Sequence, residues 1–151
     1  MRRCLLLSSL LLVAVLSLAQ NYLLPLDGRS QYGVAIAARG AEITGVCIVK
    51  TDAAGSRGAI VNEFGIHALD FTLSPDRRKV RLLNVMPALD RWYIKKVVRK
   101  DLRILFSATQ PGTQRARRVI TVGADGGVTL HNEKFKLKYN LTKINNDETA
   151  E

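Results

Sequence analysis

One segment with a helical pattern, residues 88–106, is flanked on both sides by segments with the alternating pattern of β-strands. At about 100° per residue its apolar side chains fall on one side of a helical wheel and its basic side chains on the other. Pro87 stands just before the first turn, where proline is tolerated. The apolar side comprises Tyr93, Ile94, Val97, Val98, Leu102, Ile104 and Leu105. An amphipathic helix must cover its apolar side, and here only strands are present to do so.

The strand patterns predict an antiparallel sheet of about eight strands. Five strands in succession are expected before the helix, with a turn at Arg39-Gly40 and a loop at 52–58. After the helix, a loop at 110–115 leads to a hairpin with its turn at 123–126 and then to a last strand. The predicted strands are 31–38, 41–50, 59–64, 66–73, 79–85, 117–122, 127–131 and 135–141. The predicted fold is therefore α+β, a curved, half-barrel-like antiparallel sheet packed by one long amphipathic helix.

The N-terminal 19 residues have the pattern of a signal peptide. Arg2 and Arg3 precede an apolar run from Leu5 to Leu16, and small residues follow it. The run is shorter than the roughly 20 residues of a spanning helix. We therefore predict export to the periplasm, to the inner face of the outer membrane or to the medium. One domain over residues 20–144 and a disordered tail over 145–151 would follow.

Basic residues are concentrated in the middle of the chain. The stretch 77–118 contains 13 lysines and arginines against Asp90 and Asp101, a net charge of +11. Such asymmetry attracts anionic lipid, nucleic acid or an acidic partner, or it serves as a solvated surface. Nucleic acid is a poor candidate for an exported protein. Asp101 lies near the centre of the apolar side of the predicted helix, where a carboxylate must be paired or hydrogen-bonded.

Residues that could carry chemistry are few. Removal of the signal peptide would leave Cys47 as the sole cysteine, which excludes an intrachain disulfide and a cysteine zinc site. Cys47 in a valine-rich strand is expected to be inert core filling, and His67 on an apolar strand face to be buried. A thiol–imidazole pair of Cys47 with His67 or His131 is the weaker alternative. No catalytic, metal or cofactor motif is present, so the sequence predicts a protein that is not an enzyme.

The stretch from Gly58 to Phe71 (GAIVNEFGIHALDF), the strand 79–84 and the helix entry Trp92-Tyr93-Ile94 resemble exported proteins of the Bacteroidetes type. These in turn are similar to the LolA/LolB lipoprotein-carrier superfamily. The resemblance covers about residues 40–106. It implies an open half-barrel covered by helices, acyl chains bound inside, and no catalytic residues. The chain lacks the lipid-bearing cysteine of LolB-like receptors and has no obvious helix before its first strand.

Three functions remain open at this stage. A helix about 10 Å wide covers a curved sheet only in part, and the uncovered part could bind a lipid or lipoprotein acyl chain. Alternatively, the basic region could dock on an anionic membrane or an acidic protein partner. The third possibility is a module that pairs an edge strand with a partner chain. The expected cavity residues are Phe64, Leu69, Phe71, Leu82, Val97 and Leu105. The expected anionic-surface residues are Arg91, Trp92, Lys95, Lys96, Arg99 and Arg103.

Overall fold

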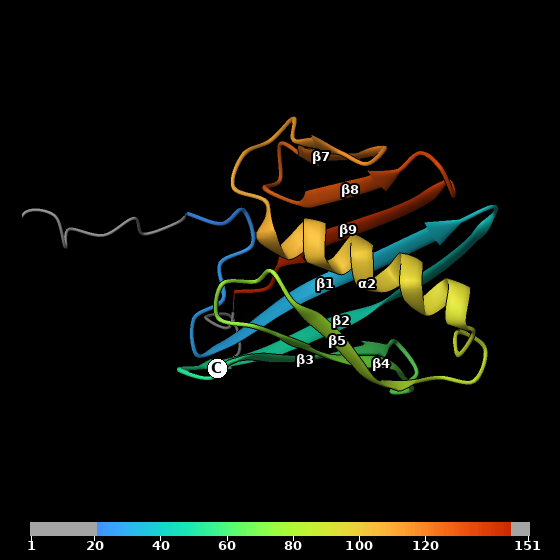
Figure 1. Ribbon diagram of the computed structural model, residues 1–151, viewed down its shortest axis with the longest axis horizontal. Helices are drawn as coiled ribbons and strands as arrows, with labels where there is room; N and C mark the ends of the chain where they lie inside the picture. The colour runs from blue at the N-terminus through green and yellow to red at the C-terminus, as the bar shows by residue number, and fades with distance from the viewer. Residues whose placement is uncertain (1–20, 146–151) are drawn as a thin grey trace, which may run out of the picture.

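Residues 21–145 are described in this computed structural model, and the nine strands among them form one antiparallel sheet (Figure 1). The strands are β1 (Arg29–Ala38), β2 (Ala41–Asp52), β3 (Gly55–Asn62), β4 (His67–Leu73), β5 (Val80–Val85), β6 (Gln114–Arg115), β7 (Arg118–Val122), β8 (Val128–Asn132) and β9 (Leu137–Lys143). Their order across the sheet is β5-β4-β3-β2-β1-β9-β8-β7-β6. The predicted curved sheet with one packing helix is confirmed. The predicted signal peptide and residues 146–151 lie outside the described residues.

The helix α2 (Trp92–Ser107) lies across one face of the sheet and contacts β5 on one side and β8 on the other (Figure 1). Its buried residues all belong to its C-terminal half: Asp101, Leu102, Ile104, Leu105 and Phe106. The four apolar ones complete the core with Phe71, whose ring centroid is 5.5 Å from that of Phe106. None of the first nine helical residues is buried. The helix therefore packs closely on the sheet only through its C-terminal half.

The helix begins four residues later than the predicted residue 88. Backbone hydrogen bonds of turn type occupy the intervening segment, including Leu89 N to the Met86 carbonyl at 2.9 Å. Arg91 is the N-cap residue and provides no side-chain cap. The Asp90 carboxylate could have capped the helix, but it forms an ion pair with Lys95 at 2.6 Å.

The predicted loop at 52–58 is wrong, because β3 begins at Gly55 and only two residues separate it from β2. Glycine and serine give this stretch a loop-like composition, yet Gly58 and Ser56 both make contacts within the sheet. The Phe71 ring lies so close to Gly58 that a Cβ atom there would stand 2.3 Å from the ring. The Ser56 hydroxyl is hydrogen-bonded to that of Thr51 at 2.8 Å. The predicted loop at 110–115 likewise ends in the short edge strand β6.

The turn between β3 and β4 overturns the expectation that His67 is buried. Asn62 Oδ1 accepts hydrogen bonds from the amides of Phe64 (3.0 Å) and Ile66 (2.8 Å), so this segment turns back on itself at the surface. The register is irregular after Ile60, which interrupts the alternation that was predicted to bury His67. His67 is instead exposed, with Nδ1 3.2 Å from Asp70 Oδ1.

Arg77 ties the β4–β5 turn to the end of the helix. Its guanidinium is buried, and Nη1 donates to the carbonyl oxygens of Leu24 (2.7 Å) and Phe106 (2.9 Å). The guanidinium also stacks 3.7 Å from the Tyr22 ring centroid. A cation on the last carbonyls of a helix is favourable for the helix dipole. The turn is therefore held against the C-terminal end of α2.

Candidate functional site

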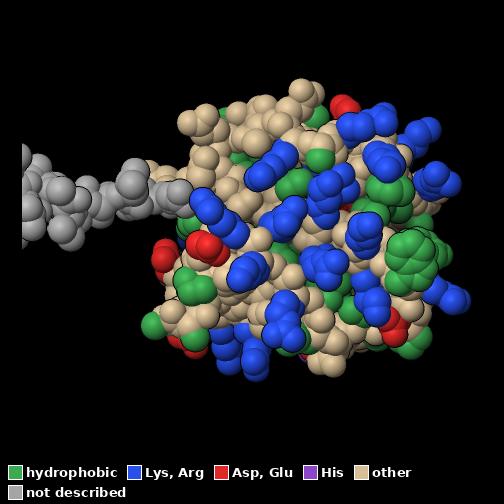
Figure 2. All heavy atoms as spheres, in the orientation of Figure 1, with side chains coloured by type: hydrophobic (Ala, Val, Ile, Leu, Met, Phe, Trp, Pro, Cys, Tyr) green, Lys and Arg blue, Asp and Glu red, His purple; other side chains and the backbone are tan. Residues whose placement is uncertain are grey.

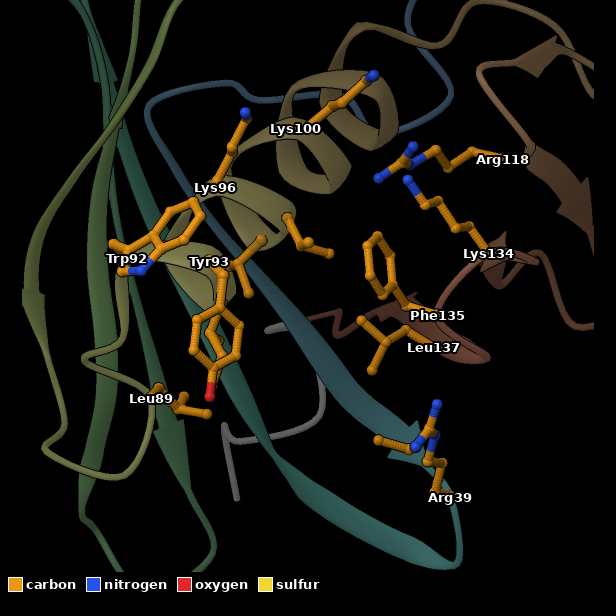
Figure 3. Close-up of a pocket in the computed structure, with 14 residues that line it drawn as sticks. Arg39, Leu89, Trp92, Tyr93, Lys96, Lys100, Arg118, Lys134, Phe135 and Leu137 are labelled. Atoms are coloured by element: carbon orange, nitrogen blue, oxygen red, sulfur yellow. The ribbon is translucent and has the colours of Figure 1, made fainter.

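A cleft of about 690 Å³ opens beneath the N-terminal half of α2 (Figure 3). The helix contributes the apolar side chains of Ile94, Val97 and Val98, which are only partly buried. Ala38 at the end of β1 and Leu137 at the start of β9 form the opposite wall, where they are direct partners in the sheet. The remaining apolar lining residues are Leu89, Trp92, Tyr93 and Phe135.

Cationic side chains surround this apolar centre. They come from three parts of the chain: Arg39 from the β1–β2 turn, Lys96 and Lys100 from α2, and Arg118 and Lys134 from the region around β7 and β8. No aspartate or glutamate occurs among the lining residues of the described chain. Figure 3 shows Phe135 and Leu137 pointing into the cleft, while Lys96 and Lys100 extend away from its apolar centre. The arrangement suits an apolar group that carries a negative charge at one end.

A buried ionic cluster fixes the middle of α2 to the sheet. Asp101 is 0% exposed, and its Oδ1 accepts from Arg118 Nε at 2.7 Å. Asn132 Nδ2 donates to both carboxylate oxygens, at 3.1 and 2.9 Å. Burial, followed by the negative charge of Asp101, raises the pKa of Tyr139. The prediction that Asp101 must have a partner is confirmed.

The same cluster shapes the wall of the cleft. Asn132 Oδ1 accepts a hydrogen bond from the Phe135 amide at 3.2 Å, which orders the turn that carries Phe135 and Lys134. Arg118 also donates from Nη1 to the Ala116 carbonyl at 2.8 Å. Phe135 was predicted to begin the last strand, but that strand begins at Leu137. The carboxylate on the helix thus positions side chains on both sides of the cleft.

The six expected cavity residues do not share one site. Leu69, Phe71 and Leu105 are buried in the filled core, and Leu82 packs partly buried against it. Only Val97 lines the cleft. Phe64 was predicted to lie between the helix and the sheet, and this is wrong. It is 80% exposed because the Asn62-centred turn carries it away from the core.

The expected anionic-surface residues lie at the N-terminal end and on the outer side of α2. Arg91, Trp92, Lys96, Arg99 and Arg103 are exposed, whereas Lys95 is half-buried and paired with Asp90. Figure 2 shows Lys and Arg side chains spread over the face that carries α2, with few Asp and Glu at its margins. The charge concentration found in the sequence is therefore a surface property. Arg77 and Arg118 are exceptions because they are buried in structural contacts.

Sequence reasoning missed most of the cleft. Ala38, Arg39 and Leu89 stand in or beside turns, and Lys134 and Phe135 precede the last strand. The strand and helix patterns that included some of them gave no sign that they meet at one cleft. Their proximity depends on the pairing of β1 with β9, which brings Ala38 opposite Leu137. The signal that could have indicated the cleft was the length of the helix. Its apolar side extends over both halves of the helix, whereas only the C-terminal half is buried in the core.

Cys47 is a free cysteine and 0% exposed, as expected of core filling. Both His67 and His131 are exposed, so the thiol–imidazole pair does not form. Loss of hydration raises the pKa of the Cys47 thiol to about 12, and burial also raises that of Tyr32 to about 12. Among residues 21–145 no cluster of His, Cys, Asp and Glu could hold a metal ion.

We expect Cys47 to resist iodoacetamide in the folded protein at about pH 8 and to react once guanidinium chloride unfolds it, because the reactive species is the thiolate. Both raised pKa values also predict alkaline sensitivity. The unfolded chain loses these protons first, so the stabilisation is complete below the ordinary pKa values and is lost as the pH rises toward about 12. Peptide mass spectrometry measures the labelling, and urea unfolding at rising pH measures the stability. Equal labelling of folded and unfolded protein would contradict this assignment.

No protein-family model and no curated protein matches this chain. In the part of the chain that the structure describes, no helix has the length and hydropathy needed to cross a membrane.

Proposed function

We propose that this protein is an exported, non-enzymatic binding protein of the cell envelope whose cleft takes the acyl chain of a lipid or lipoprotein. The observation that carries the proposal is the combination of an apolar cleft centre with a rim of four cations, those of Arg39, Lys96, Lys100 and Lys134. Among the described residues these four form no ion pair and no lining residue carries a carboxylate, whereas Arg118 is already paired with Asp101. An acyl chain demands apolar surface and few polar contacts, which Ile94, Val97 and Leu137 supply. The cleft volume of about 690 Å³ lies within the range of roughly 300–1,000 Å³ that small-molecule sites occupy.

The protein carries its own reporter of binding. Trp92 is the only tryptophan of the chain, lines the cleft and is 76% exposed. A bound acyl chain should shield the indole from water, so titration with a long-chain fatty acid should shift its fluorescence to shorter wavelength. Mass spectrometry of organic extracts from protein purified without detergent should detect lipid. An empty extract together with an unchanged Trp92 spectrum would overturn the proposal.

The substitution Val97→Asp tests whether the acyl chain binds in the cleft. It places a carboxylate in the apolar centre of the cleft, and we expect fatty-acid affinity to fall at least tenfold, about 1.4 kcal/mol. Val122→Asp makes the same chemical change at an exposed position of β7 outside the cleft and should leave affinity unchanged. Circular dichroism and thermal unfolding verify that both variants fold. An equal loss of fatty-acid affinity in the two variants would show that the acyl chain does not bind in the cleft.

Docking on an anionic membrane is a second candidate function, favoured by one observation. Trp92 and Tyr93 are both exposed and form an edge-to-face pair, with centroids 5.9 Å apart, at the end of the basic helix. Aromatic rings beside cations are typical of interfacial helices. Under this function, Trp92→Ala should weaken binding to phosphatidylglycerol vesicles, and added salt should weaken it further. Binding that is insensitive to both changes would exclude this candidate.

A further inference from the structure

A second depression, of about 420 Å³, lies between the outer side of α2 and the segment that leads into β5. Apart from Val80, every residue that lines it is basic: Arg78, Lys79, Lys96, Arg99, Lys100 and Arg103. We call it the basic groove. Its composition differs from that of the cleft, in which apolar side chains dominate. It can therefore bind a group that carries several negative charges.

The basic groove and the cleft share two side chains. Lys96 and Lys100 line both depressions and stand one helical turn apart on α2. The two sites therefore adjoin along this ridge. An elongated ligand can place its apolar part on one side of the ridge and its charged part on the other.

Among residues 21–145, no cationic side chain of the groove forms an ion pair. The three ion pairs of the described residues are His67–Asp70, Lys95–Asp90 and Arg118–Asp101, and none includes a groove residue. Asp76 precedes Arg78 and Lys79 in the same turn, but its carboxylate is used within that turn, accepting from Ser74 Oγ (2.5 Å) and Arg78 N (3.0 Å). Those hydrogen bonds, and then the charges of Arg78 and Lys79, lower the pKa of Asp76.

The helix itself would gain from an anion in the groove. Lys96 with Lys100 and Arg99 with Arg103 are like-charged pairs at a spacing of four residues, which destabilises a helix. Its first turn contains no acidic residue to offset them. A bound anion would relieve this repulsion while forming charge-assisted hydrogen bonds.

The two walls of the groove are held in place before any ligand arrives. The buried Arg77 attaches the turn before β5 to the Phe106 carbonyl at 2.9 Å, and Ser74 N donates to the Lys79 carbonyl at 3.0 Å. Arg78 and Lys79 are therefore presented to α2 by a hydrogen-bonded turn. Such preorganisation reduces the entropy lost on binding.

We propose that the basic groove is the headgroup site for the same ligand whose acyl chain occupies the cleft, and that this ligand is a lipid with a phosphorylated, multiply charged headgroup. The inference rests on the proposed function, because the cleft must hold the chain. It adds the chemical class of the ligand and assigns the headgroup to Arg99 and Arg103 on one wall and to Arg78 and Lys79 on the other.

Two lysolipids with the same acyl chain test the proposal, both used below their micelle concentrations. Lysophosphatidic acid carries a phosphomonoester, whereas lysophosphatidylcholine has no net charge. We expect the acid to bind at least tenfold more tightly at low salt, as a single hydrogen bond to a charged group would give. This preference should diminish as the ionic strength rises. The Trp92 fluorescence and isothermal calorimetry supply the affinities and a stoichiometry near one.

Variants locate the headgroup. The double variant Arg99→Gln/Arg103→Gln removes two groove charges that do not line the cleft, and should reduce the preference to about onefold without changing lysophosphatidylcholine affinity. The control Lys50→Gln/Arg57→Gln removes two exposed charges from β2 and β3 and should keep the preference. Thermal unfolding shows whether each double variant is folded. If the groove variant does not fold, Arg78→Gln/Lys79→Gln, which removes the two charges of the opposite wall, replaces it with the same expectation.

The outcomes separate the two proposals. If neither lysolipid binds, the proposed acyl-chain function fails and the inference fails with it. If both bind equally, or if the preference survives in the groove variant, the acyl-chain function stands and the headgroup assignment is overturned. If many lipids bind per protein and only in vesicles, the groove is a membrane-docking surface and the single-ligand proposal is overturned.

Discussion

Replacing Asp101 by alanine is expected to lower the free energy of unfolding by about 3–5 kcal/mol, the typical cost of removing one partner of a buried ion pair. The variant leaves the Arg118 guanidinium, whose side chain is 5% exposed, without a counter-charge. It also removes the acceptor of both Asn132 hydrogen bonds. Urea unfolding followed by circular dichroism measures the loss. The cleft should open further, because Asn132 no longer holds the Phe135 turn in one orientation.

A double-mutant cycle separates the pair from its surroundings. Asp101→Leu combined with Arg118→Met replaces both charges by apolar groups of similar volume, and should be far more stable than either single variant. A loss below about 1 kcal/mol for Asp101→Ala, as exposed ion pairs give, would contradict the burial of this cluster.

Replacing Phe71 by alanine is expected to cost about 3–5 kcal/mol of unfolding free energy. The Phe71 side chain is 0% exposed and packs against the Phe106 ring of α2, with 34° between the ring planes. Its ring also occupies the space above Gly58 where any other residue would have a Cβ atom. The substitution therefore leaves a cavity at the contact between sheet and helix, and backbone elements on both sides restrict its collapse.

Phe64→Ala is the matched control for this prediction. It makes the same substitution seven positions earlier, at a side chain that is 80% exposed, and should change stability by no more than about 0.5 kcal/mol. Denaturant midpoints of the two variants give the comparison directly. Similar losses would show that Phe64 packs in the interior of the protein rather than at its surface.

The main elements of the fold could be predicted because their signals are local. A period of two residues in β4, β5 and β9, the Val, Ile and Ala content of β1 and β2, and a period near 3.6 in α2 are all properties of neighbouring residues in the chain. The need for a partner of Asp101 was equally evident, because its neighbours on the helix are apolar. The choice of Arg118 and Asn132 as partners was not evident, since they are 17 and 31 residues away.

The errors of prediction arose where distant atoms override a local pattern. Gly58 belongs to a strand because the Phe71 ring needs the space above it, and Phe64 is exposed because Asn62 bends the chain there. The cleft has the same origin: its walls meet only because β1 pairs with β9 and places Ala38 opposite Leu137. Amphipathic periodicity thus defined the sheet, the helix and the basic surface from the order of residues. Strand pairing and the position of α2 across the curved sheet determined which apolar side chains became core and which were left to line a cleft.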